Sequence, residues 1–287
     1  MDIQSTISSV PRVKRPEHVQ VKPRNLRFGI PKDVPRHWFD NDPFMTHFMN
    51  ALTLTFPRGE RSFIESVKAV RDKVKSPALR ADIVGFLGQE ALHSREHDAL
   101  NDVLEAMGYP IHALEREFSA RLDQREHSMS EKSRLAFTAA VEHLTALFGR
   151  ILLTKEEVRD MIHPELRAIW MWHALEEIEH KAVAFDVYQD VFDDETTRRV
   201  ALILATGLFL SFTHYAQYQL LKRDGLANKP SVWAKGLWKL WGPKGLGRSA
   251  IPTWVDYLRR DFHPWHEDDS GLIAEFETTI LPRATAS

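Results

Sequence analysis

Two blocks of acidic and imidazole side chains constrain the fold of this 287-residue chain more than any other feature. The first is Glu90-Ala-Leu-His93, and the second runs from His173 to His180 and includes Glu177. In each block a glutamate stands three residues before a histidine, and side chains at that spacing share one face of an α-helix. We therefore expect two helices that each present a carboxylate and an imidazole to the same side.

Apolar periodicity extends the helical pattern over most of the chain. Pro57 and Gly59 interrupt the first periodic stretch, Ser76-Pro77 ends the second, and Ser130 is a typical N-cap residue. No long segment alternates with period two, so the prediction is an all-α protein. The expected helices cover residues 43–56, 58–76, 78–107, 131–154 and 164–192, with a further apolar segment at 200–221.

Two isolated glutamates complete the pattern. Glu142 lies in the middle of its predicted helix, where His143 competes with it for the inward face. Glu60 falls in the first turn of its predicted helix, where an acid also complements the helix dipole, and Glu65 is the alternative. In the last block Glu177 is preferred over its acidic neighbours, because it alone lies four residues from His173 and three from His180.

Carboxylates that converge in a helical core repel one another and lose their hydration, so such a site calls for positive charge. One Glu from each of two helices and a Glu-x-x-His from each of two others is the ligand pattern of di-iron and di-manganese ferritin-like bundles. The chain has no cysteine, which leaves oxygen and imidazole ligands and suits iron, with manganese as the alternative. We thus expect a ferritin-like four-helix bundle with additional N- and C-terminal helices and two metal ions, held by Glu60, Glu90, His93, Glu142, Glu177 and His180.

The same residues resemble those of known families. His173-x-x-x-Glu177-x-x-His180, after the earlier ligands, resembles the seven-ligand set of the di-iron arylamine N-oxygenases, which implies that His173 is a seventh ligand. Phe56-Pro-x-Gly-Glu60, the block from Glu90 to His97 and Phe262-His-Pro-Trp265 are similar to the bacterial family of predicted metal-dependent hydrolases. This second resemblance is the closer one and covers most of residues 30–270.

The two resemblances imply different reactions. We expect a di-iron oxidoreductase that activates dioxygen to oxidise a small or apolar substrate, with an electron donor as partner. The alternatives are a two-metal hydrolase and a noncatalytic iron-handling protein. The zinc-protease motif His-Glu-x-x-His is absent, and a net charge of −2 gives no reason to expect a nucleic-acid partner.

The remaining expectations concern the organisation of the chain. Residues 1–42, which are rich in proline and basic groups, predict an extended arm; residues 43–222 would form the bundle and 223–287 a C-terminal extension. No secretory signal is evident, so a cytoplasmic location is expected. The uncharged stretch 200–221 and the Trp- and Lys-rich segment that follows it are compatible with a buried helix or with peripheral membrane contact through 200–244, and a homodimer is compatible with the sequence.

Overall fold

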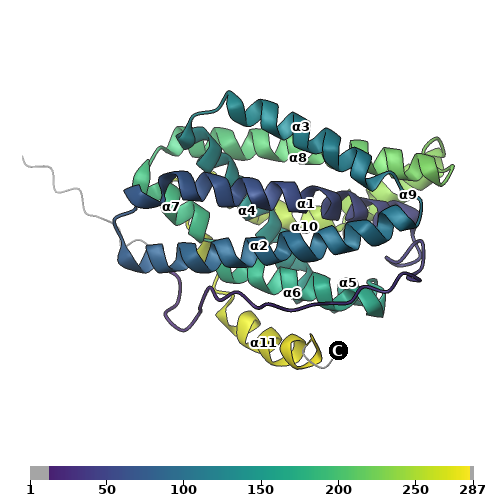
Figure 1. Cartoon of the computed structure of the whole chain (residues 1–287), viewed down its shortest axis with the longest axis horizontal. Helices are drawn as coiled ribbons and strands as arrows, with labels where there is room; N and C mark the ends of the chain where they lie inside the picture. The colour runs from purple at the N-terminus through teal and green to yellow at the C-terminus, as the bar shows by residue number, and fades with distance from the viewer. Residues whose placement is uncertain (1–12, 285–287) are drawn as a thin grey trace, which may run out of the picture.

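The protein, described by a computed structural model over residues 13–284 with side chains to residue 279, is built from helices that run mostly along one long axis (Figure 1). The described residues contain no strand, only an isolated bridge between Phe39 and Ile162, which confirms the all-α class. The helices are α1 (Pro43–Val70), α2 (Pro77–Ala106), α3 (Ile111–His127), α4 (Glu131–Thr154), α5 (Glu156–Asp160), α6 (Pro164–His180), α7 (Val183–Val191), α8 (Glu195–Arg223), α9 (Pro230–Trp241), α10 (Leu246–Asp256) and α11 (Ser270–Ala284), with short 3₁₀ turns at Arg71–Lys73 and Pro264–His266.

The predicted break at Pro57 is wrong, because α1 continues through this residue. Proline has no N–H to donate, so the carbonyl four residues earlier, that of Thr53, loses its helical partner. Nδ2 of Asn101 on α2 donates to that carbonyl at 3.2 Å, and Oγ of Ser94 donates to the carbonyl of Pro57 at 3.3 Å. The contact with Asn101 replaces the missing bond. Because α1 is continuous, Glu60 lies well inside a long helix instead of in a first turn.

Two other boundaries differ from the sequence prediction. Helix α3 was not expected, because only Ile111 and Leu114 of its residues are buried and its apolar periodicity is correspondingly weak. The helix predicted over 164–192 is interrupted after His180, where Lys181 and Ala182 separate α6 from α7. Nζ of Lys181 is buried there and donates to Asp269 at 2.6 Å.

The ends of the chain also depart from the expectation of extra helices on both sides. Residues 13–42 contain no helix and run as an extended arm past α6 and α11, while residues 1–12 lie outside the described part (Figure 1). The C-terminal extension is helical in α9, α10 and α11, and its last residues, 285–287, are likewise outside the description. The ferritin-like topology itself stays a prediction.

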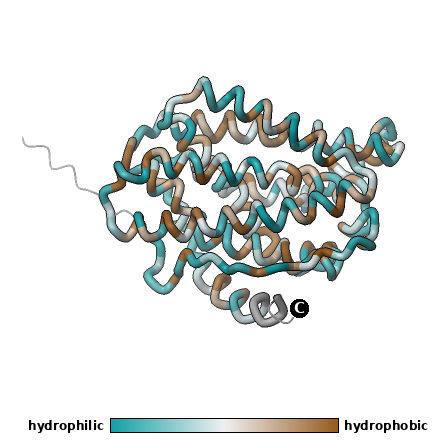
Figure 2. The backbone as a smooth tube through the Cα atoms, viewed as in Figure 1, coloured by the Kyte–Doolittle hydropathy of each residue, from teal (hydrophilic) through white to brown (hydrophobic). Residues whose placement is uncertain are grey.

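Buried apolar residues form two clusters within the helical body. Hydrophobic and hydrophilic residues alternate along the long helices, as their amphipathic packing requires (Figure 2). One cluster includes Trp172, whose ring lies 4.8 Å from that of His93; the other includes Phe86, whose ring lies 5.1 Å from that of His180. A group of buried polar side chains thus contacts both halves of the core.

Candidate dinuclear metal centre

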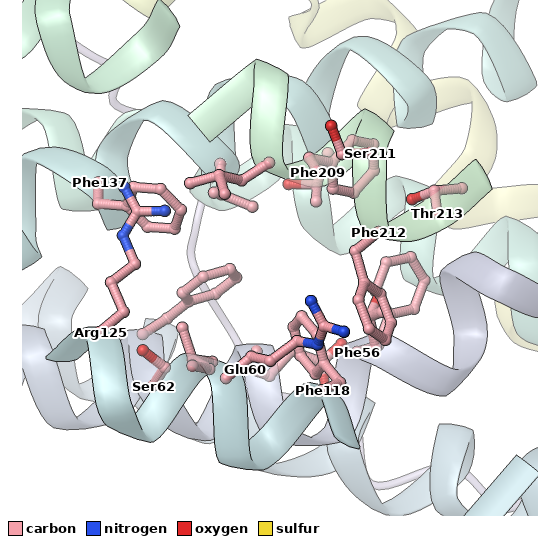
Figure 3. A pocket seen from close by; sticks show the side chains of 18 of the residues that line it. Phe56, Glu60, Ser62, Phe118, Arg125, Phe137, Phe209, Ser211, Phe212 and Thr213 are labelled. Carbon is pink, nitrogen blue, oxygen red and sulfur yellow. The ribbon is translucent and has the colours of Figure 1, made fainter. Parts of the chain in front are cut away.

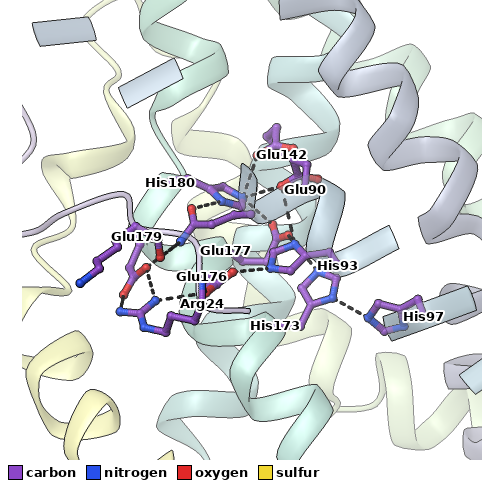
Figure 4. A network of polar contacts seen from close by, with 12 residues as sticks. Arg24, Glu90, His93, His97, Glu142, His173, Glu176, Glu177, Glu179 and His180 are labelled. Carbon is purple, nitrogen blue, oxygen red and sulfur yellow. Dashed lines mark hydrogen bonds and ion pairs between the residues drawn. The ribbon is translucent and has the colours of Figure 1, made fainter. Parts of the chain in front are cut away.

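The structure buries all seven side chains that the sequence singled out, and none is more than 5% exposed. They come from four helices of the chain, and the labelled side chains of α2, α4 and α6 point toward one another (Figure 4). The residues are Glu60 on α1, Glu90 and His93 on α2, Glu142 on α4, and His173, Glu177 and His180 on α6.

Six of the seven side chains form two groups of ligand-like atoms. Glu60, His93 and His173 each contribute one atom to a group in which all atoms lie within 4.8 Å of one another. Glu90, Glu177 and His180 form a second such group. Three atoms this close together, from carboxylates and imidazoles, are spaced for a single metal ion, so the geometry could accommodate two ions.

Glu142 extends one of these groups, and Glu177 links the two. Oε2 of Glu142 lies 3.3 Å from Nε2 of His180, which adds a fourth side chain to the second group. Oε1 of Glu177 lies 2.9 Å from Nε2 of His173 and 3.7 Å from Nδ1 of His93, so this carboxylate reaches both groups. Glu177 is therefore placed to bridge two ions.

Apart from Nε2 of His173 and Oε1 of Glu177, which bond to each other, most ligand-like atoms of this cluster make no hydrogen bond with the described residues. Both carboxylate oxygens of Glu60, Glu90 and Glu142 are buried without a partner, as are Nδ1 of His93, Nε2 of His180 and one oxygen of Glu177. Buried polar atoms in native proteins are almost always satisfied, and an unmet one costs about 1–3 kcal/mol. A bound cation would satisfy these buried atoms together, so the residues fit a metal site.

The electrostatics of the site without metal show the same demand for positive charge. Burial raises the pKa of Glu142 to about 7, and burial together with neighbouring carboxylates raises the pKa values of Glu60 and Glu90 well above their usual range. Burial also raises the pKa of Glu177, but the charges of His180 and His173 outweigh it and hold that pKa well below normal. Conversely, Glu177 and Glu142 raise the pKa of His180 against the effect of its burial.

The second nitrogen of each imidazole is fixed from outside the cluster (Figure 4). Nε2 of His93 lies 3.0 Å from Oε2 of Glu176, and Nδ1 of His180 lies 3.0 Å from Oε1 of Gln89. In the neutral imidazoles that metal binding requires, with those nitrogens as donors, Nδ1 of His93 and Nε2 of His180 would carry the lone pairs that face the cluster. Carboxylates and carbonyl oxygens commonly orient metal-binding histidines in this way.

The third imidazole, His173, is held by a longer relay. Its Nδ1 lies 2.6 Å from Nε2 of His97, whose Nδ1 lies 2.7 Å from Oγ1 of Thr53. Burial and the neighbouring histidines lower the pKa of His97, so this ring is neutral. One of its nitrogens then donates a hydrogen bond and the other accepts one, so the contacts from Thr53 to His173 all run in the same donor-to-acceptor direction. Thr53 is the residue whose carbonyl Pro57 leaves free, so the same turn of α1 serves both contacts.

Glu176 and Glu179, the acidic neighbours over which the sequence favours Glu177, are buried as well. They face a different partner, Arg24 of the N-terminal arm. Its guanidinium donates to Glu179 at 2.5 and 2.7 Å and to Glu176 at 3.3 Å. Nε2 of Gln89 donates to the same Glu179 at 2.8 Å. The arm thus carries an ion pair that lies behind His93 and His180.

Close approach of α4 and α6 brings Glu142 to the centre. A Cβ atom at Gly149 of α4 would lie 3.0 Å from the carbonyl oxygen of Ala174 and 3.4 Å from Cβ of Glu177. These would be tight contacts, so the absence of a side chain at Gly149 lets the two helices lie close together. His143, the competitor of Glu142, turns away to Tyr257 at 4.7 Å between ring centroids, and burial lowers its pKa to about 3.

Other candidate residues lie apart from the centre. Glu65 is more than half exposed and lies 3.6 Å from Arg134, so it is not a member of the cluster. His263 accepts a hydrogen bond from the backbone N–H of Trp265, and its Nε2 lies 2.9 Å from Asp186.

A further group of metal-compatible atoms joins His37, His47 and Asp224 at the end of α8. Both histidines lie 2.8 Å from Oδ2 of Asp224. The guanidinium of Arg36 donates to the other carboxylate oxygen at 2.6 and 2.8 Å. Because an arginine already supplies the positive charge, this group is an ion-pair network that fastens the arm to the end of α8.

A cavity of about 320 Å³ adjoins the cluster (Figure 3). Glu60, His173 and Glu177 form part of its wall, and the rest of the lining is mainly apolar and comes from α1, α3, α4 and α8. Phe56, Phe118, Phe209 and Phe212 are among the lining residues. The cavity therefore gives a small apolar molecule access to one side of the candidate centre.

Comparison with known proteins gives a match to a family. Neither the curated proteins nor the solved structures include a match. Residues 22–268 match the family described as predicted metal-dependent hydrolase. This match covers the four helices that carry the cluster, the arm residue Arg24 and the Phe262–Trp265 segment. The chain therefore belongs to the family of predicted metal-dependent hydrolases.

Proposed function

We propose that the protein is a metal-dependent hydrolase that holds two metal ions in the cluster and acts on an apolar substrate bound in the adjoining cavity. The observation that carries this proposal is the set of buried carboxylate and imidazole atoms without partners in two adjacent groups. The family description supports the reaction type. The four glutamates carry four negative charges when ionised, and two divalent ions would balance them.

Each protein group has a specific task in this proposal. Glu60, His93 and His173 would hold one ion, Glu90, Glu142 and His180 the other, and Glu177 would join them. Bound ions of this kind supply Lewis acidity and an activated water, or, if they are iron, reactivity with dioxygen. Glu176, Gln89 and His97 keep the imidazoles in the tautomers and orientations that binding needs.

The cavity contributes exclusion of water and orientation of the substrate. Its aromatic lining removes bulk solvent from the side of the cluster formed by Glu60 and Glu177. A low local dielectric strengthens the interaction of every charge there with a bound substrate. The wall composition favours substrates whose bulk is hydrocarbon or aromatic.

A second candidate, oxidation by dioxygen at a di-iron centre, is favoured by the ligand set. Four carboxylates and three histidines from interior helices match the donor chemistry of di-iron bundle proteins. The enclosed apolar cavity would suit the same substrates in either reaction. The two candidates share the metal centre and differ in whether they require a redox-active metal and an electron donor.

Metal content tests the metal centre that both candidate reactions require. We expect purified protein to hold two equivalents of metal by elemental analysis, and the Glu90→Ala and His180→Ala variants to lose most of it. Glu65→Ala is the matched control, since this exposed glutamate lies outside the cluster. Circular dichroism establishes that each variant is folded. Unchanged metal content in both cluster variants would remove the proposed centre.

Reconstitution separates the reactions. Chelator-treated protein loaded with manganese or zinc under argon should hydrolyse p-nitrophenyl esters of medium-chain acids, and His180→Ala should abolish this activity. Dioxygen uptake that depends on an organic substrate after ferrous loading would overturn hydrolysis in favour of oxidation. Iron oxidation without any organic product would instead indicate an iron-handling protein.

A further inference from the structure

The cavity beside the metal centre contains charge as well as apolar surface. Helix α3, which the sequence pattern did not predict, contributes Arg121 and Arg125 to its lining. Arg121 is already paired, because it donates to Glu117 at 2.5 Å on the exposed surface of the same helix. Arg125 is the residue whose charge needs an explanation.

Arg125 has no carboxylate partner within the part of the chain that the structure describes. Its guanidinium lies over the ring of Phe137, 4.5 Å from the centroid (Figure 3). Burial lowers the pKa of this guanidinium, with no nearby acid to offset the effect. The acids closest to it in sequence, Asp123 and Glu126, pair instead with Arg58 at 2.5 and 2.8 Å.

An unpaired, partly buried guanidinium in an apolar cavity is a recognition element for an anion. Its planar donors match the two oxygens of a carboxylate, and such charge-assisted bonds are among the strongest in proteins. One guanidinium balances one negative charge, which favours a carboxylate over a dianionic phosphate. The apolar walls formed by Phe118, Phe137 and Phe212 then accommodate the rest of the molecule.

We propose that the substrate is an amphipathic carboxylate whose anionic end binds Arg125 while its apolar body extends through the cavity to Glu60, His173 and Glu177. This inference rests on the proposed function for its catalytic meaning, but binding of such a molecule can be measured without any activity. Arg125 acts as a specificity-determining residue, since it would select acids over neutral molecules of the same shape.

Calorimetric titration with octanoate and with 1-octanol, a neutral probe of similar length, tests the proposal. We expect wild-type protein to bind octanoate more tightly than octanol. Arg125→Ala should weaken octanoate binding about tenfold to a hundredfold, as expected for loss of a charged hydrogen bond, and leave octanol binding unchanged. Arg125→Lys should recover part of the affinity because it keeps the charge.

Two controls make the outcome specific. Arg116→Ala removes a charge from an exposed position on the same helix that does not line the cavity, and it should bind octanoate as wild type does.

Octanoate could instead bind the metal ions directly; in that case its affinity would survive Arg125→Ala and disappear in the metal-depleted Glu90→Ala variant. That result, or equal affinity of wild type for octanoate and octanol, would overturn the role of Arg125. Retention of Arg125-dependent binding in a Glu90→Ala protein that lacks metal would support it even if the proposed reaction were wrong.

Discussion

At the scale of single residues, the centre is defined by acids that are costly to bury. Glu60, Glu90 and Glu142 have raised pKa values because burial and mutual repulsion disfavour their charged forms. In the metal-free protein each therefore retains a proton at a pH at which the unfolded chain would have lost it. Metal ions compete with those protons, so metal binding and pH are linked at the same atoms.

This linkage predicts how stability depends on pH. A carboxyl group whose pKa is raised on folding stabilises the protein less as the pH rises from the group's pKa in the unfolded chain to its pKa in the folded protein. For Glu142 this window runs from about 4.5 to about 7. The metal-free protein should lose stability across this window, on the order of 3 kcal/mol from Glu142 alone. Added manganese should consequently raise the melting temperature more at about pH 8 than at about pH 5.5.

Thermal melts of chelator-treated and manganese-loaded protein at both pH values provide the measurement. Glu142→Gln is the diagnostic variant, because a neutral amide of nearly the same shape removes the titrating group. It should flatten the pH dependence of the metal-free protein. An equal manganese shift at both pH values would contradict the linkage.

At the scale of elements, the extended arm is part of the centre. It carries Arg24, which neutralises Glu176 and Glu179 behind the histidines, and it crosses α2 where glycine leaves room. A Cβ atom at Gly85 would lie 2.0 Å from the carbonyl oxygen of Val21. The arm consequently depends on the absence of a side chain at this position of α2.

Replacement of Gly85 with alanine should therefore destabilise the protein, although alanine favours helix by about 1 kcal/mol over glycine. We expect a net loss of about 1–3 kcal/mol, typical of overpacking, together with weaker metal retention as Arg24 withdraws from Glu176. Gly207→Ala is the matched control: it lies inside α8 with open space at its Cβ position, and it should stabilise the protein.

Denaturant unfolding and metal analysis of the two variants check this prediction. If Gly85→Ala were as stable as Gly207→Ala, the arm would not be held against α2 in the way described.

At the scale of the whole molecule, one face of α8 has no partner within the described residues. Helices α4 and α8 are both long and apolar enough to cross a membrane by composition, but α4 is 83% buried and α8 only 33% over the relevant window. Ile203, Leu204 and Leu208 on α8 are about half exposed, and Trp238 on α9, the next helix in the chain, is 68% exposed. Leu208 also lines the cavity, so this face continues to the binding site.

We expect this face to bind the surface of a membrane that contains anionic lipid. No residue from Val200 to Leu221 carries a formal charge, and Lys222 and Arg223 follow at once. Trp238 lies on α9 near exposed Lys235, a combination that suits the headgroup region. A carboxylate with an apolar tail could then pass from the lipid to the cavity.

Co-sedimentation with vesicles of phosphatidylcholine and phosphatidylglycerol measures this binding. Leu204→Asp should reduce the bound fraction severalfold, whereas Val84→Asp, which changes a 72% exposed residue on α2, should not. No binding by the wild type would contradict the expectation. Sedimentation analysis of the same variants shows whether the face instead joins two copies of the chain.

Local sequence was sufficient for the all-α class, for the helices that match α2 and α4, and for the two Glu-x-x-His pairs, Glu90 with His93 and Glu177 with His180, which are buried together. This is because a three-residue spacing determines which side chains share a helix face before any tertiary contact forms. The helix break predicted at Pro57 is wrong, because Asn101 from another helix replaces the hydrogen bond that proline removes. Local sequence also missed α3, whose few buried residues leave little periodicity to detect.

Only the tertiary structure decided which acids face the cluster and which face Arg24. Glu176, Glu177 and Glu179 are neighbours in sequence and all three are buried, but their roles differ because the arm covers one side of α6 and the cluster lies on the other. Arg24 and Arg125 carry no local signal, since an arginine in an extended arm or on a polar helix looks like any surface cation. Their significance comes from what surrounds them in space, and contacts between residues so far apart in sequence depend on the packing of the whole chain.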